Sequence, residues 1–164
     1  MFAKLSALTL AAALAATPAL AADEAMVVSI KRLSMDTAVK LAQATVAACR
    51  EKGIQIGVTV VDRDGTVQVQ LRDTIAASIT VPISKMKAFT AANFNAATSA
   101  MTARADTPIG RIDGLVMSAG GLPIQVGGSL LGALGVSGAP EGATDEECAK
   151  KGLEAVAGDL ELAD

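Results

Sequence analysis

The chain has 164 residues, a formal net charge of −3 at neutral pH, and no histidine, tryptophan or tyrosine. This length suits one domain with a substantial hydrophobic core. A mildly acidic chain whose only aromatic residues are three phenylalanines lacks the basic surface and stacking side chains that bind nucleic acids, so no nucleic-acid partner is expected.

Residues 1–21 have the pattern of a secretory signal peptide. A short basic start precedes an apolar run over residues 5–16, and an A-x-A cleavage pattern ends at Ala21. The run is shorter than the about 20 residues of a transmembrane helix, which disfavours a retained anchor. We expect cleavage after Ala21, or alternatively after Ala22. This leaves a single periplasmic or secreted domain, residues 22–164, with no membrane association.

The first half of the mature chain predicts a helix followed by a hairpin. Ser34 is a good N-cap, and Gly53 ends the helix after a last turn that contains Lys52. One face of this helix carries Met35, Val39, Ala42, Val46 and Cys49. Residues 56–61 and 67–72 then alternate on either side of an Asp-Gly turn, which is a strong signal for two antiparallel strands.

The middle of the chain predicts a second helix and an irregular segment. Residues 78–99 favour a helix in which Pro82 is tolerable only near the first turn. Residues 102–121 are less regular because they contain one proline and four glycines, and a short strand is expected near residues 115–118.

A second hairpin and a final helix complete the predicted fold. Residues 122–126 and 130–136 flank a Gly-Gly turn, and Thr144 opens the last helix with Glu147 in a capping box. The predicted order is α-β-β-α-β-β-β-α, an α+β fold with a mostly antiparallel sheet of about five strands flanked by helices.

The glycine-rich stretch over residues 130–151 does not support two common chemistries. A phosphate would be repelled by the acidic residues that open the last helix, and no GxxxxGK[ST] motif occurs. Residues 135–139 lack the final glycine of G-x-S-x-G, and without histidine no histidine-assisted serine or cysteine nucleophile exists. No catalytic residue and no metal site are expected, and the glycines are interpreted as turns and close contacts.

Four segments nevertheless resemble the GlcG/HbpS-like family of haem-binding and haem-degrading proteins. They occur in the family's order and span roughly residues 34–160: residues 58–65 with 71–73, residues 87–91 with Thr98, residues 120–124, and residues 132–138 with 145–146. The resemblance implies a sheet flanked by helices, as in the C-terminal domain of PduO-type proteins. It also implies self-association into a homo-oligomer and binding of haem or a related small ligand.

The resemblance also supplies candidate ligand-contacting residues, which are Arg72, Lys87, Thr90, Thr98, Gly120, Gly121 and Asp145. Arg72 and Lys87 could bind a propionate or another small carboxylate. Alternatively, each could pair with Asp62, Asp73 or Asp145 within the fold. Histidine and tyrosine axial ligands are excluded, so only weak ligands remain for haem iron. These are a threonine oxygen, a cysteine sulfur, and the sulfurs of Met86, Met101 and Met117, although methionine more often fills a core.

Three functions stay open at this point. The first is an exported, non-catalytic protein that binds haem or a related small ligand. The second is an enzyme that acts on haem or a small organic acid through Arg72, Asp73, Lys87 and Asp145. The third is an oligomeric structural or sensory module that acts through a protein partner, with Ala91, Ala92, Ala96 and Ala97 in a tight subunit contact.

The two cysteines, Cys49 and Cys148, could form one disulfide in an oxidising compartment or remain two buried thiols. If the first and last helices lie antiparallel on one sheet face, the two cysteines become neighbours. A bridge requires a Cα separation below about 7 Å.

Overall fold

The computed structural model describes residues 26–162. The expected signal peptide and its cleavage site lie outside the described residues. The elements follow the order α1 (Met35–Glu51), β1 (Gly57–Asp62), β2 (Val67–Arg72), α2 (Thr80–Phe94), the 3₁₀ helices η1 (Thr98–Arg104) and η2 (Pro108–Arg111), β3 (Gly121–Val126), β4 (Ser129–Ser137) and α3 (Gly142–Leu162). Within these residues, no helix is both long and apolar enough to cross a bilayer.

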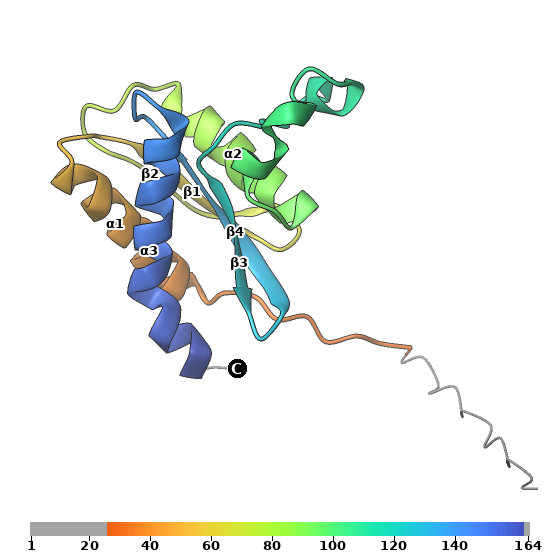
Figure 1. Ribbon diagram of the computed structural model, residues 1–164. Helices are drawn as coiled ribbons and strands as arrows, with labels where there is room; N and C mark the ends of the chain where they lie inside the picture. Colours follow the sequence, from red (N-terminus) through yellow and green to blue (C-terminus); the bar gives the residue numbers. More distant parts are fainter. Residues whose placement is uncertain (1–25, 163–164) are drawn as a thin grey trace, which may run out of the picture.

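The strands form one antiparallel sheet in the order β2-β1-β4-β3. This confirms the predicted α+β fold, with four strands in place of about five. Helices α1 and α3 lie side by side on one face and α2 covers the other face (Figure 1). The central strand β1 is buried along its whole length because both faces of the sheet are covered.

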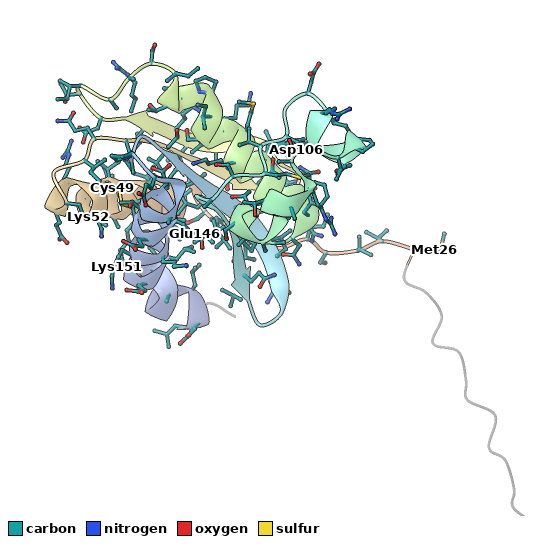
Figure 2. The ribbon with its side chains drawn as sticks, turned by 45° about the horizontal axis from the view of Figure 1, so that its top comes forward. Met26, Cys49, Lys52, Asp106, Glu146 and Lys151 are labelled. Carbon is teal, nitrogen blue, oxygen red and sulfur yellow. A yellow bond between two sulfur atoms is a disulfide. The ribbon has the colours of Figure 1, made fainter. Side chains whose placement is uncertain are left out.

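Helices α1 and α3 are antiparallel, as three pairs of residues along them show. From one end to the other these pairs are Cys49 with Cys148, Thr45 with Gly152, and Lys40 with Asp159. The first pair is a disulfide with a Cα separation of 5.4 Å, which decides between the two alternatives for the cysteines. Figure 2 labels Cys49 and Lys52 near the end of α1.

Contact between α1 and α3 depends on the missing side chain of Gly152. A Cβ at this position would lie 1.9 Å from Oγ1 and 3.0 Å from Cβ of Thr45. Thr45 is buried, and its hydroxyl donates to the Leu41 carbonyl at 2.8 Å, so it cannot turn away freely. The two helices must therefore separate to accommodate any larger residue.

Replacing Gly152 by alanine is expected to lower the free energy of unfolding by about 1–3 kcal/mol, the usual cost of overpacking. Gly158 in the same helix is the matched control, since a Cβ there has no neighbour within 4 Å. Gly158→Ala should stabilise the protein by about 0.5–1 kcal/mol. Urea unfolding of both variants measures the difference, and equal stabilisation by both would contradict this helix contact.

Helix α2 packs on the opposite face through small side chains. Ala88, Ala91 and Ala92 are buried in one cluster with Val61 and Ala133 of the sheet. Ala91 and Ala92 therefore pack inside their own subunit, which is incompatible with the subunit contact predicted for them. Where the helix crosses β4, a Cβ on Gly135 would lie 2.0 Å from the Ser84 carbonyl oxygen, so glycine is required there.

The end of α2 and the start of α3 differ from the prediction, and so do the roles of the two residues of the predicted capping box. Helix α2 ends at Phe94, before the expected residue 99, because Asn95 takes a left-handed conformation with φ 47°. Helix α3 begins at Gly142, two residues before Thr144, so Thr144 lies inside the first turn and is not a capping residue. Glu147, the other half of the predicted capping box, instead pairs with Lys52 at 2.8 Å.

The short strand expected over residues 115–118 is not a strand. Side-chain hydroxyls occupy its backbone groups: the Val116 N–H donates to Thr90 Oγ1 at 2.9 Å, and the Ser118 carbonyl accepts from Thr98 Oγ1 at 2.6 Å. The preceding residues form η1, which packs against α2 and β3, and η2, which projects from the body of the domain (Figure 1).

Candidate functional site

Five of the seven candidate residues form a buried polar cluster between α2, β3, β4 and α3. At its centre Lys87 Nζ donates to Asp145 Oδ2 and to the Val136 carbonyl, both at 2.9 Å. The Lys87 and Asp145 side chains are each 4% exposed. The second carboxylate oxygen of Asp145 accepts from the Ala139 N–H at 2.9 Å. The sequence alternative in which Lys87 pairs with Asp145 is therefore the arrangement observed.

Gly120, Gly121 and Thr98 enclose this ion pair. Gly120 has φ 119°, and a Cβ on it would lie 2.8 Å from Lys87 Nζ. A Cβ on Gly121 would meet the Lys87 carbonyl at 2.5 Å. Thr98 Oγ1 accepts from the Gly121 N–H at 2.9 Å, which holds η1 against the start of β3. Side chains at either glycine would displace the lysine.

Burial raises the pKa of Asp145 above the ordinary aspartate value, although the Ala139 N–H and the Lys87 ammonium oppose the rise. The cluster joins α2 to the start of α3 and the end of β4. Because its charges pair with each other and face the interior, its chemical role is to fix these elements.

The remaining two candidates lie apart from the ion pair. Thr90 is fully buried one turn further along α2, where its hydroxyl donates to the Met86 carbonyl at 2.8 Å and accepts from Val116. Arg72 is exposed at the end of β2, and its Nη1 donates to the Ala76 carbonyl at 2.6 Å. The structure therefore places Thr90 next to the five-residue cluster on the same helix as Lys87, and Arg72 away from it.

An open cavity of about 360 Å³ lies on the outer side of α2. We call it the α2 cavity; it is lined by Pro82, Lys85, Met86, Phe89, Asp113 and Gly114. The helical spacing of Pro82, Met86 and Phe89 places these three side chains on one face of α2. The walls are mainly apolar, with one ammonium and one carboxylate, and the volume is within the range of about 300–1,000 Å³ for small-molecule sites.

Sequence reasoning missed this cavity as a unit, although it included Met86 among weak ligands. The available signal was the 82-86-89 spacing on the side of α2 away from the buried alanines. The opposite wall of the cavity, formed by Asp113 and Gly114, could not be predicted, because these residues follow an irregular segment that has no periodic pattern.

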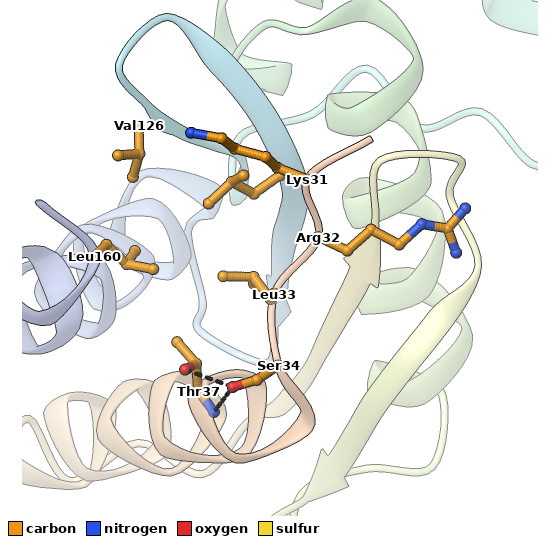
Figure 3. Close-up of a pocket in the computed structure, with 8 residues that line it drawn as sticks. Lys31, Arg32, Leu33, Ser34, Thr37, Val126 and Leu160 are labelled. Carbon is orange, nitrogen blue, oxygen red and sulfur yellow. Dashed lines mark hydrogen bonds between the residues drawn. The ribbon is translucent and has the colours of Figure 1, made fainter. Parts of the chain in front are cut away.

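A third region of interest lies where the N-terminal segment meets α3. It is a cavity of about 360 Å³ lined by residues 31–34, Thr37, Val126, Leu131 and Leu160. Figure 3 shows Leu33 and Leu160 pointing toward each other across it, with the Ser34 cap on Thr37 at one side. The buried Leu33 anchors the start of the described chain to the main core.

The structure narrows the candidate ligands for haem iron. Cys49 and Cys148 are joined to each other and offer no thiolate. Thr90, Thr98, Met101 and Met117 are buried. Met86 differs from them because it is half-buried and lines the α2 cavity. Among these candidates it combines a sulfur ligand with an open apolar surface.

Comparison with solved structures identifies close matches to the whole domain. A double mutant of HbpS from Streptomyces reticuli is 35% identical, with a TM-score of 0.76, covering 87% of this chain and 98% of that chain. A second HbpS structure is 34% identical, with a TM-score of 0.76 and coverage of 84% and 99%. A PduOC:haem complex is 25% identical, with a TM-score of 0.71 and coverage of 76% and 94%.

Comparison with curated proteins gave no significant match. The model of the family described as "Haem degrading protein HbpS-like" matches residues 33–154, which includes every strand and most of the final helix. The chain therefore belongs to the HbpS-like family.

Proposed function

We propose that this protein is exported and binds haem or a closely related small ligand in the α2 cavity, without catalysing a reaction. The observation that carries the proposal is the position of Met86 in an apolar cavity, in a chain of the HbpS-like family. The solved haem complex of PduOC, which shares the fold, supports a haem-related ligand.

The lining of the α2 cavity fits the three chemical parts of haem. Phe89 and Pro82 offer apolar contact to the macrocycle, Met86 offers a thioether to the iron, and Lys85 offers an ammonium to a propionate. When bound, haem supplies the redox chemistry of its iron, while the protein holds and orients it.

A haem titration of the mature protein tests this proposal. We expect a saturable Soret shift at micromolar haem, and Met86→Leu should alter the band position and weaken binding because leucine keeps the volume but loses the sulfur ligand. Met35→Leu is the matched control, since Met35 is 67% exposed at the start of α1. Absence of a Soret shift would refute the proposal. Loss of the bound band on adding ascorbate would indicate degradation in place of simple binding.

Export is supported by the signal-peptide pattern and by the disulfide, a bond typical of oxidising compartments. The mature protein is then periplasmic or secreted and should begin at Ala22 or Asp23. Intact mass of the protein recovered from outside the cytoplasm measures the cleavage site directly.

We also propose that the mature chain forms a homo-oligomer. Several large apolar side chains are exposed on the described surface, among them Ile75, Ile79, Ile109 and Ile112. Exposed apolar surface of this kind commonly marks a contact with another chain. Light scattering on a sizing column should give a mass of at least two chains, and a strict monomer at micromolar concentration would contradict self-association.

A further inference from the structure

The segment before α1 carries apolar side chains that nothing in its own domain covers. Residues 26–32 belong to no helix or strand, and they lead away from the body of the domain (Figures 1 and 2). We call residues 26–30 the arm. Because side chains alternate along an extended chain, a fully extended arm places Met26, Val28 and Ile30 on one face. These three residues are 100%, 72% and 49% exposed.

A groove of about 550 Å³ lies between β3 and the second half of α3. We call it the β3–α3 groove; residues 123–127 form one wall and one face of α3 forms the other. Val126, Leu153 and Leu160 are half-buried and pack against the main core, so they form an apolar floor that is partly open to solvent. The groove continues the cavity lined by residues 31–34, since both include Val126 and Leu160.

The shape of the β3–α3 groove suits an extended peptide. Strand β3 pairs with β4 on one side, and no strand of the described residues 26–162 pairs with its other side. An extended segment can pair with such an edge and place alternate side chains on the apolar floor. The α3 wall runs from Lys150 to Glu161, about 16 Å of helix, and residues 26–31 span about the same length when extended.

The charges of the groove and of the segment are opposite in sign. One lysine and two glutamates of α3 line the groove and give it a net charge of −1. Glu161, at the end near Val126, has no ion pair within the described part of the chain. Residues 26–32 carry a charge of +2 from Lys31 and Arg32. Docking with the basic end of this segment toward Glu161 is therefore favourable.

We propose that the arm of one copy of this chain binds in the β3–α3 groove of a second copy. Each copy has both an uncovered arm and an uncovered groove, so a symmetric exchange covers both surfaces in both copies. The inference rests on the homo-oligomer proposed above, and it adds the segment and the surface that form the contact.

Cysteine cross-linking of the mature protein tests the position of the arm. The two native cysteines are joined to each other, so an added pair reports alone. We expect the double variant Val28→Cys/Ala157→Cys to form 28–157 bridges between chains on mild oxidation, giving covalent dimers whose bridge peptide mapping identifies. Val28→Cys/Ala155→Cys is the matched control, because Ala155 is exposed on α3 but does not line the groove. The control should bridge at least about tenfold more slowly, since docking raises the local concentration of the arm.

A charge on the apolar face of the arm tests whether this contact holds the copies together. Val28→Asp should raise the dissociation constant of the oligomer at least about tenfold, because the burial of a valine is lost and a carboxylate enters the groove. Ser29→Asp adds the same charge to the other face and should have a smaller effect. Light scattering over a dilution series measures both variants. Unfolding curves should match the wild type, because residues 28 and 29 are exposed within their own chain.

Four results would overturn the proposal. The first is the absence of a 28–157 bridge, and the second is equal bridging in the Ala155→Cys control, which would indicate random collision. The third is a 28–157 bridge within a single chain, which would show that each arm occupies its own groove. The fourth is equal weakening by Val28→Asp and Ser29→Asp. If any of these results appears while the wild type still has the mass of an oligomer, the exchange of arms is refuted and self-association through another surface stands.

Discussion

Replacing Lys87 by methionine is expected to lower the free energy of unfolding at neutral pH by about 3–5 kcal/mol, the usual cost of removing one partner of a buried ion pair. Methionine keeps the length of the side chain but leaves Asp145 without its ammonium and the Val136 carbonyl without its donor. Urea unfolding measures the loss. Lys85→Met, an exposed position two residues earlier on α2, is the matched control and should change stability by less than about 0.5 kcal/mol.

The difference in free energy of unfolding between wild type and Lys87→Met should become smaller as the pH is lowered toward the ordinary carboxyl pKa. Burial already raises the pKa of Asp145, and loss of the lysine removes one of the influences that oppose the rise. A raised carboxyl pKa means that the folded state binds the proton more tightly, so stability is lost as pH rises through that pKa. Adding Asp145→Asn to Lys87→Met should recover part of the stability at neutral pH. Equal costs for Lys87→Met and Lys85→Met would show that the pair does not support the fold.

Removing the disulfide should have an effect of similar size. The bridge joins residues 99 positions apart, and the chain-entropy model assigns about 4–5 kcal/mol to a loop of this length. The Cys49→Ala/Cys148→Ala variant should therefore unfold at much lower denaturant concentration. Its m-value should rise because the unfolded chain exposes more surface without the cross-link.

Reduced wild-type protein is the control that separates the cross-link from packing. It keeps both sulfurs in the core between α1 and α3, so its loss of stability reports the cross-link alone. We expect most of the loss in the double alanine variant to appear in the reduced wild type as well. A reduced protein within about 1 kcal/mol of the oxidised one would contradict the entropic account, given that typical bridges contribute about 2–4 kcal/mol.

Local patterns in the sequence were sufficient for most of the scaffold. Ser34 and Gly53 mark the start and end of α1 because caps depend only on neighbouring residues. The turns at Asp64-Gly65 and Gly127-Gly128 likewise predict both hairpins. The antiparallel sheet follows from these hairpins, whereas the placement of α1 and α3 on one face, which brings the cysteines together, is known only from the structure.

Features that depend on distant contacts were harder to predict. Thr90 and Thr98 form hydrogen bonds with backbone groups of residues 116–121. Because these bonds replace those of a sheet, residues 115–118 do not form the expected strand. Lys87 and Asp145 are 58 residues apart, and nothing local distinguishes this pairing from solvation or from a ligand contact. The α2 cavity was not predicted, because one of its walls is an irregular segment whose position depends on distant contacts.

The central claim is that haem or a related ligand occupies the α2 cavity. The most direct measurement is an NMR titration of the mature protein, labelled with ¹³C at the methionine methyl groups, with diamagnetic zinc protoporphyrin. A porphyrin ring shifts nearby methyl signals strongly, and cleavage of the leader leaves Met26, Met35, Met86, Met101 and Met117 to report. We predict a large, saturable upfield shift of the Met86 methyl with little change at Met35. A Met86 signal that stays in place while the porphyrin binds would contradict the account.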